Sequence, residues 1–404
     1  MNTAEILKAH GQEHLLDRTG WSEQESLALD EQLKALDWET VELWKNPEDL
    51  SGKGHIEPID GVRIPEIEAR RNECERAGID AIKKGKVACV LLAGGQGTRL
   101  GVDGPKGAYD IGITRPVYIF ERLIANLTDV CNRCMATVPL YIMTSDKNDA
   151  ETRAFLRAHD YFGYPEAYVK FFRQDMAPSV DFDGKLLLEE RGKLVLSPNG
   201  NGGWYSSLCK SGLYADLKKS GVEWLNVFAV DNVLQRMADP AFVGATVLSG
   251  KKSGAKVVCK SCPEEKVGVL CLEDNKPSII EYYEITPEMA AMRDEKGDLK
   301  YIYGVILNYL FNVKRLEEIA KERIPVHVVK KKIPHLDGNG NLVKPEKENG
   351  YKFETLILDM IKLMGSCLPF EVEREREFAP IKNKTGVDSV ESAQALLKLN
   401  GVQL

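Results

Sequence analysis

The chain has 404 residues, of which 43% are hydrophobic, and its formal net charge is −7 at pH 7. This length predicts two or three structural units with ample core, and the acidic balance without a basic stripe excludes a nucleic-acid polymer as an expected partner. No apolar run approaches the ~18 residues that span a bilayer, so we expect no membrane partner. The nine cysteines are scattered and odd in number, which predicts a reducing, cytoplasmic compartment.

Helical periodicity dominates the first 45 or so residues, where leucines recur at helical spacing, and a second charged helix is predicted over residues 65–84. Strands then alternate with helices. The predicted strands are 87–92, 140–144, 169–173 and 224–230, and the predicted helices are 117–127, 149–158 and 206–219. Near-continuous apolar strands separated by helices are typical of a mostly parallel sheet covered on both faces, so the predicted fold class is α/β.

The second half of the chain changes in texture. Residues 267–272 and 278–285 are predicted to form a hairpin, and 303–311 a strand, alone or leading into a helix. Helices are predicted near 352–364 and at 389–399. We therefore expect a helical N-terminal region over residues 1–85, a central domain with a β-rich insertion over 86–335, and a small C-terminal segment over 336–404.

The most informative motif is the glycine-rich stretch 91–101, which follows the first predicted strand and precedes Pro105-Lys106-Gly107. Glycines there let backbone N–H groups approach a phosphate or a base edge, and Arg99 and Lys106 add positive charge. The spacing does not match a P-loop, and Leu100 stands where a dinucleotide fingerprint needs its third glycine. The stretch predicts a nucleotide whose phosphates are bound here, and the alternative is an ordinary turn between a strand and a helix.

Three further motifs follow predicted strands or apolar runs, where ligands bind in open α/β sheets. Gln174 offers a donor and an acceptor together, which suits an imide edge such as uracil, or it lies on the surface. The stretch 198–205, which contains Gly200 and Asn201, approaches a ligand closely or forms a mobile loop. Asp231 ends an apolar strand, where it could bind Mg²⁺ or cap the next helix.

Two weaker candidates lie downstream. Glu281 interrupts an apolar run, and its carboxylate either accepts hydrogen bonds from sugar hydroxyls or faces solvent. Lys382 follows the apolar turn 378–381, and taken by itself it would be a surface lysine.

In this order, the motifs resemble the eukaryotic UDP-sugar pyrophosphorylases, and most of all the members that make UDP-N-acetylglucosamine. The segments that carry the resemblance cover nearly the whole chain: 92–107, 171–178, 182–185, 197–205, 230–232, 254–258, 280–284, 332–334 and 377–383. The resemblance implies a Rossmann-like nucleotidyltransferase (GT-A-like) domain with a mixed sheet covered by helices. It also implies a Mg²⁺-dependent reaction of UTP with N-acetylglucosamine-1-phosphate that yields UDP-N-acetylglucosamine and pyrophosphate.

The resemblance also assigns roles to single residues. Arg99 and Lys106 would bind the UTP phosphates, Asp231 would bind Mg²⁺, and Lys382 would join them in the catalytic set. Substrate contacts would come from Leu92, Ala93, Gly94, Gly95 and Gln174 to uracil, from Gly200 to the nucleotide, from Asn201 and Glu281 to the sugar, and from Lys352, with Lys382, to phosphate. Because the sugar phosphate is itself the nucleophile, no protein nucleophile is needed.

At two places the chain departs from the family pattern, which limits the roles that the resemblance can assign. The family has an asparagine that contacts the N-acetylated sugar where this chain has Val305, so Asn308 compensates or the sugar preference shifts towards glucose or a mixed set. The β-rich C-terminal domain of longer members has no counterpart before Leu404, which leads us to expect a monomer. A sensor of sugar nucleotides without catalysis is a further alternative, disfavoured by the full set of phosphate-binding groups.

Overall fold

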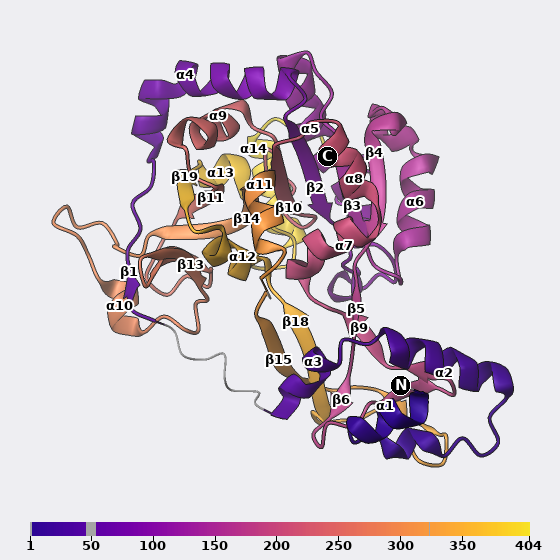
Figure 1. Ribbon diagram of the computed structural model, residues 1–404. Coiled ribbons are helices and arrows are strands. Elements are labelled where there is room, and N and C mark those ends of the chain that lie inside the picture. Colours follow the sequence, from indigo (N-terminus) through magenta and orange to yellow (C-terminus); the bar gives the residue numbers. More distant parts are fainter. Residues whose placement is uncertain (1, 46–53, 323) are drawn as a thin grey trace. The chain divides into compact units, whose positions relative to one another are not determined.

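The computed structural model describes residues 2–45, 54–322 and 324–404 (Figure 1). It divides into two compact units that are discontinuous in sequence. The first comprises Met1–Gly52, Asp175–Gly203 and Ile324–Ile357, and the second comprises Lys53–Gln174, Trp204–Arg323 and Leu358–Leu404. The three consecutive segments expected from the sequence group residues differently, and their boundaries stay a prediction.

A ten-stranded mixed sheet forms the centre of the second unit, with the strand order β1-β12-β14-β10-β2-β3-β4. Its strands are β1 (Ile56–Glu57), β2 (Val87–Leu92), β3 (Leu140–Thr144), β4 (Val169–Arg173), β10 (Trp224–Ala229), β11 (Ser253–Cys259), β12 (Val269–Glu273), β13 (Lys276–Ile280), β14 (Tyr303–Asn312) and β19 (Cys367–Glu371). Strands β10, β2, β3 and β4 are parallel neighbours, whereas β14 pairs antiparallel with β10. The α/β class is confirmed, and the sheet is mixed because β14 reverses direction.

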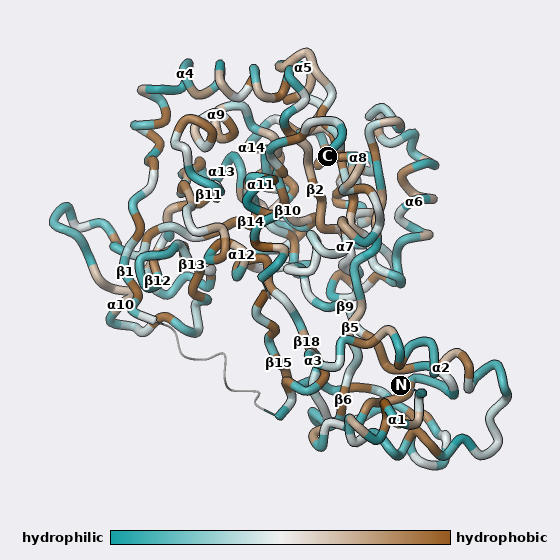
Figure 2. Tube along the Cα trace, in the orientation of Figure 1, coloured by the Kyte–Doolittle hydropathy of each residue, from teal (hydrophilic) through white to brown (hydrophobic). Residues whose placement is uncertain are grey.

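Helices cover this sheet, and those near its edges are rich in hydrophilic residues (Figure 2). They are α4 (Ile64–Lys83), α5 (Ile119–Cys134), α6 (Asp149–Ala158), α7 (Trp204–Lys210), α8 (Leu213–Lys219), α9 (Pro240–Ser249), α10 (Pro287–Ala291), α11 (Val313–Ile319), α12 (Ile357–Met364), α13 (Arg374–Glu377) and α14 (Val390–Leu399). Helices α4 and α9 cross closely at two glycines, since a Cβ on Gly78 would lie 1.9 Å from the Pro240 oxygen and one on Gly244 would lie 1.7 Å from the Cys74 oxygen.

The sequence predictions for β2, β3, β4 and α6 match the observed bounds, and three others in this unit need correction. The single helix predicted over 206–219 is two helices, because Gly212 adopts a φ of +81° between them. The helix predicted at 117–127 continues to Cys134. The second hairpin strand, β13, ends at Ile280 rather than at residue 285, so Glu281 follows the strand instead of lying within it.

The first unit packs N-terminal helices against small sheets. Its helices are α1 (Thr3–Ala9), α2 (Glu23–Ala35) and α3 (Trp38–Val41), and its strands are β5 (Met176–Pro178), β6 (Val180–Asp181), β7 (Leu188–Glu190), β8 (Lys193–Leu194), β9 (Leu196–Pro198), β15 (Val326–Lys331), β16 (His335–Leu336), β17 (Leu342–Val343) and β18 (Gly350–Thr355). Its core includes Leu7, Leu29, Leu33 and Phe353. The helix predicted from residue 352 is therefore wrong for its first part, because residues 350–355 pair with β15 and only α12 is helical.

Candidate functional site

The candidate site of the second unit lies where the order of parallel strands reverses. From β2 the chain adds β3 and β4 on one side and then returns to place β10 on the other side. Leu92 and Ala229 are register partners at the carboxyl ends of β2 and β10, and the Val230 N–H donates to the Leu92 oxygen at 3.2 Å. Such a topological switch point is where ligands bind in open α/β sheets.

The glycine-rich loop folds back on itself just beyond β2. The Gly97 N–H donates to the Gly104 oxygen at 2.9 Å, and the Lys106 N–H donates to the Gly95 oxygen at 3.2 Å. This second contact places Lys106 beside the start of the loop although it is eleven positions further along the chain. The loop thus carries both of its predicted phosphate-binding cations on one short, closed segment.

Asn148, which the sequence does not predict as a site residue, holds the backbone of this loop in place. Its fully buried amide nitrogen donates to the Ala93 oxygen at 2.9 Å and to the Gly95 oxygen at 3.3 Å. Its own oxygen accepts from the Ser145 N–H at 2.8 Å. The backbone of residues 93–95 is therefore held in place before any ligand arrives.

A hollow of about 420 Å³ opens at this strand end. It is lined by Gly95, Gln96, Thr98, Arg99, Leu100, Lys106, Asp231 and Lys382. All four residues of the predicted catalytic set are thus brought together from three distant parts of the chain. Three cations around one carboxylate make the hollow suited to a polyphosphate.

Lys106 and Asp231 face each other across the hollow, with Nζ 3.8 Å from Oδ2. Burial lowers the pKa of Lys106, and the positive charges of Arg99 and Lys382 lower it further, while Asp231 opposes them. Asp231 does not cap the next helix, because Asp239 caps α9. The alternative of a capping role is therefore wrong.

Lys382 is positioned through the segment that precedes it. The Ile381 N–H donates to the Asp231 oxygen at 2.9 Å, and the buried Asn232 amide bridges the Glu377 oxygen and the Ala379 N–H at 2.7 and 2.9 Å. The Lys382 ammonium donates to Asp388 at 2.8 Å. These contacts hold residues 377–382 against the end of β10.

Gln174 lies directly beside the loop. Its N–H donates to the Thr144 oxygen at 2.8 Å, and a Cβ on Gly94 would lie 2.9 Å from its Oε1. The side chain is 8% exposed, so Gln174 is not a surface glutamine. The structure thus joins Gly94 and Gln174, which the sequence assigned to the same base-binding task.

We expect Gly94→Ala to weaken UTP binding about tenfold, because the new methyl group pushes the Gln174 amide out of place. Equilibrium dialysis with labelled UTP measures this effect. In a Gln174→Ala background the same change should cost much less, since the two residues act on one contact. Fully additive losses would show that Gly94 acts independently of Gln174.

Two of the residues predicted around the sugar, Glu281 and Val305, lie at a second place on the same unit. A Cβ on Gly268 would lie 3.4 Å from Val305 Cγ2 and 3.7 Å from Glu281 Oε2. Asn308 does not join them, because its fully buried amide accepts from Asn226 at 2.7 Å and donates to Gln235 at 3.4 Å. Compensation for Val305 by Asn308 is therefore wrong.

Gly200, Asn201 and Lys352 belong to the first unit. Gly200 has a φ of +84°, and a Cβ there would lie 2.1 Å from the Thr355 oxygen, so its glycine is required by backbone packing. The Asn201 side-chain oxygen accepts from the Ile357 N–H at 3.0 Å, and Lys352 is half-buried on β18. Their ligand roles stay predictions.

The donors around the hollow fit a magnesium ion that arrives with its substrate. Among the described residues, no three His, Cys, Asp or Glu side chains cluster in a way that could hold a metal ion. Asp231 supplies the only carboxylate among the described residues that line the hollow. Mg²⁺ is commonly held by one or two carboxylates and substrate phosphates, so this donor set is compatible with it.

Comparison with known proteins identifies the family. The model of the family described as UTP–glucose-1-phosphate uridylyltransferase matches residues 30–402. The chain belongs to this family. Within the family, it is 42% identical over 323 residues to the mouse UDP-N-acetylhexosamine pyrophosphorylase-like protein 1, covering 78% of this chain and 64% of that protein.

Two further members are similar over most of the chain. The UDP-N-acetylglucosamine pyrophosphorylase of Saccharomyces cerevisiae is 39% identical over 346 residues, which are 82% of this chain and 72% of the yeast protein. The solved structure of the uridine diphosphate N-acetylglucosamine pyrophosphorylase from Trypanosoma brucei superimposes with a TM-score of 0.83 at 28% identity, covering 97% of this chain and 83% of that one. The nucleotidyltransferase fold expected from the resemblance is thus confirmed. No helix in the described part of the chain is long and apolar enough to span a membrane.

Proposed function

We propose that the protein is a uridylyltransferase that converts UTP and N-acetylglucosamine-1-phosphate into UDP-N-acetylglucosamine and pyrophosphate. The observation that carries the proposal is the hollow at the switch point, where Arg99, Lys106 and Lys382 converge on Asp231. The names of the yeast and trypanosomal relatives support the choice of sugar. Mere binding of a sugar nucleotide would not need this concentration of phosphate-binding charge, which disfavours the sensor.

In the proposed reaction, a phosphate oxygen of the sugar phosphate attacks the α-phosphorus of UTP. The new P–O bond forms as the bond to the β-phosphate oxygen breaks, and pyrophosphate leaves with the electron pair. The protein's task is to align the two phosphates and to neutralise the charge that develops. Arg99 and Lys106 stabilise the departing pyrophosphate, and Lys382 contacts the phosphate of the sugar phosphate.

Asp231 would hold Mg²⁺ together with phosphate oxygens. When bound, the ion supplies charge neutralisation and polarises the α-phosphate. The Ile381 N–H donates to the Asp231 backbone oxygen, which holds the backbone of the residue before Lys382 beside the proposed metal ligand.

The uracil ring is proposed to lie against the backbone of residues 92–95, with Gln174 bonded to its edge. Glu281 and Val305 would bound the sugar. In the first unit, Gly200 is proposed to frame the nucleotide, Asn201 to contact the sugar through its amide nitrogen, and Lys352 to contact phosphate. The fixed backbone under Ala93 and Gly95 favours this role, because the base meets donors and acceptors that are already oriented.

The alternative substrate is glucose-1-phosphate, alone or in a mixed set. Val305 favours it, since valine offers no hydrogen-bond partner to an N-acetyl group. We expect pyrophosphate release with UTP and Mg²⁺ to be fastest with N-acetylglucosamine-1-phosphate in a panel of sugar-1-phosphates. Faster release with glucose-1-phosphate would reject the proposed sugar, and no release with any sugar would favour the sensor.

We further propose that the protein works as a cytoplasmic monomer without a nucleic-acid or membrane partner. All nine cysteines are free thiols, which suits a reducing compartment. Light scattering on the eluted protein tests the monomer, and a mass near twice 45.1 kDa would reject it.

A further inference from the structure

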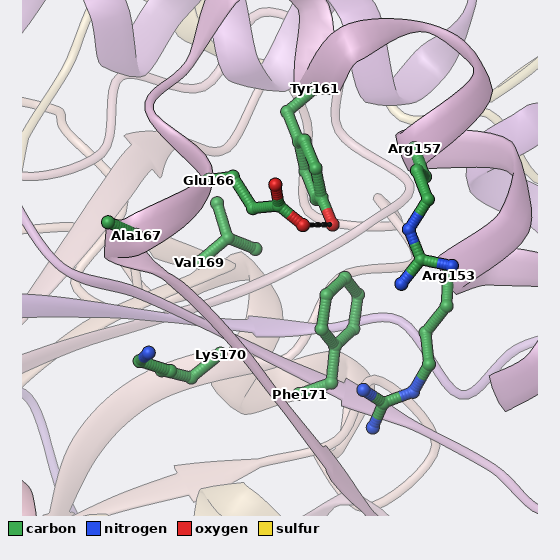
Figure 3. Close-up of a pocket in the computed structure, with 8 residues that line it drawn as sticks. All are labelled: Arg153, Arg157, Tyr161, Glu166, Ala167, Val169, Lys170 and Phe171. Carbon is green, nitrogen blue, oxygen red and sulfur yellow. Dashed lines mark hydrogen bonds between the residues drawn. The ribbon is translucent and has the colours of Figure 1, made fainter.

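A second hollow, of about 480 Å³, lies on the same unit at the outer edge of the sheet (Figure 3). It is lined by Arg153, Arg157, Tyr161, Glu166, Ala167, Val169, Lys170 and Phe171. None of these residues lines the hollow around Asp231. The edge hollow is therefore a separate feature that the proposed function does not use.

Positive charge prevails in the edge hollow. In Figure 3, Arg153 and Arg157 from α6 lie on one side and Lys170 from β4 on the other. The single carboxylate of the lining, Glu166, accepts from the Tyr161 hydroxyl at 2.9 Å. Arg157 and Lys170 are exposed, and neither forms a salt bridge with another of the described residues. Arg157 shares a hydrogen bond with the Tyr161 hydroxyl, and both cations keep further N–H donors for a ligand.

The backbone that lines this hollow is strained. Asp160, Tyr161 and Phe162 adopt φ values of 48°, 47° and 51°, in succession. Non-glycine residues adopt this left-handed region only at a cost in free energy, because the Cβ crowds the following carbonyl oxygen. The turn brings the 5% exposed Tyr161 side chain into the hollow beside Arg157. Strain of this kind concentrates at functional sites, where the surrounding structure holds it in place.

We propose that the edge hollow binds the phosphate group of a small anionic metabolite. Arg157 and Lys170 supply the charge-assisted hydrogen bonds, and Arg153 adds a third cation that is oriented by Phe171, with its guanidinium carbon 4.5 Å from the ring centre. A volume of about 480 Å³ suits a ligand of this size.

The edge hollow is connected to the candidate uracil site by a short chain of contacts. The Arg153 Nε donates to both Asp149 oxygens, at 3.0 and 2.9 Å. The same carboxylate accepts from the Thr144 hydroxyl at 2.6 Å, and the Thr144 backbone oxygen accepts from the Gln174 N–H at 2.8 Å. A bound phosphate that attracts Arg153 competes with Asp149 for its guanidinium. Phosphate binding should therefore change the environment of the Gln174 backbone amide.

The test is a titration with inorganic phosphate, followed by backbone amide NMR shifts of the full chain. A Lys106→Ala, Lys382→Ala background first removes two cations of the other hollow. In that background we expect saturable shifts along residues 157–171 and at Gln174. Adding Arg157→Ala and Lys170→Ala should weaken the affinity at least about tenfold, because each removes a charge-assisted contact. The dispersed spectrum of each variant confirms that it is folded.

The matched control replaces two exposed cations elsewhere on the same unit, Arg76→Ala and Lys398→Ala, and should leave phosphate binding unchanged. Equal weakening by the control pair would show a general effect of net charge and overturn the proposal. Linear, unsaturable shifts, or shifts confined to the Asp231 hollow, would also overturn it. Turnover does not enter this test, so failure of the proposed reaction leaves its outcome readable.

Discussion

Replacing Lys106 by alanine is expected to lower kcat/KM for pyrophosphate release about 10²–10³-fold, as removal of one preorganised charge donor at a reacting centre typically does. Lys106 faces Asp231 across the hollow and is one of the three cations that line it. Since the side chain is 15% exposed, water replaces its charge poorly. Steady-state kinetics with UTP, Mg²⁺ and N-acetylglucosamine-1-phosphate measure the loss, and circular dichroism checks the fold.

Lys398→Ala is the matched control, because this exposed lysine lies on α14 and outside the hollow. It should keep near-normal turnover, whereas Asp231→Ala should lose it as strongly as Lys106→Ala does. Near-normal turnover of both site variants would refute the proposed mechanism.

The pH dependence offers a second readout for Lys106. Its pKa is lowered from 10.5 by burial and by the neighbouring cations, so its charge is lost at a lower pH than that of an ordinary lysine. Because the charged form is the active one, kcat/KM should fall as the pH rises through this lowered pKa. Lys106→Arg should move that alkaline decline upwards, since a guanidinium stays charged.

The sequence predicts the parallel part of the sheet well because β2 and β3 are continuous, fully buried runs and β4 is a short run built around Val169, Phe171 and Phe172. Strands β2, β3 and β4 begin and end where the pattern predicts. Strand β18 is wrongly predicted as helix, because its burial pattern is irregular and only one residue separates it from α12. Its strand character depends on pairing with β15, a partner that no local pattern identifies.

The candidate site is predictable where its residues carry the charge that a bound phosphate would need. Arg99, Lys106 and Asp231 lie in motifs that the residues alone mark, Lys382 is added by the family resemblance, and the structure brings all four to one hollow. Asn148 and Asn232 act on backbone atoms of distant segments, so their roles emerge only with the fold. A buried amide after a strand is the signal that could have found Asn232, and nothing local marks Asn148.

Lys256 illustrates the same limit and leads to the largest predicted loss of stability. Its side chain is fully buried on β11, and its ammonium donates to Asp239 at 3.0 Å, to Glu377 at 2.6 Å and to the Arg236 oxygen at 2.9 Å. Burial raises the pKa of Glu377. It acts in the same sense on Asp239, where the charges of Lys256 and Arg236 prevail and hold the pKa low. The cluster ties α9 to the segment that leads to Lys382.

Lys256→Met is expected to lower the free energy of unfolding by about 3–5 kcal/mol, because it removes the cation and leaves buried carboxylate groups without compensation. Urea unfolding followed by tryptophan fluorescence measures the change as a lower midpoint. Lys84→Met is the matched control, since the Lys84–Asp80 pair is largely exposed and its loss should hardly move the midpoint.

A triple variant separates the charge imbalance from the loss of packing. Adding Asp239→Asn and Glu377→Gln to Lys256→Met removes the uncompensated acids while keeping the shape of the side chains, so part of the lost stability should return. The Asn232 amide donates to the Glu377 backbone oxygen, which Glu377→Gln leaves in place, so the segment that leads to Lys382 should stay held in the triple variant. An unchanged midpoint in Lys256→Met would show that the cluster contributes no net stability. If the triple variant unfolds at a midpoint no higher than that of Lys256→Met, the lost stability is due to packing instead of charge.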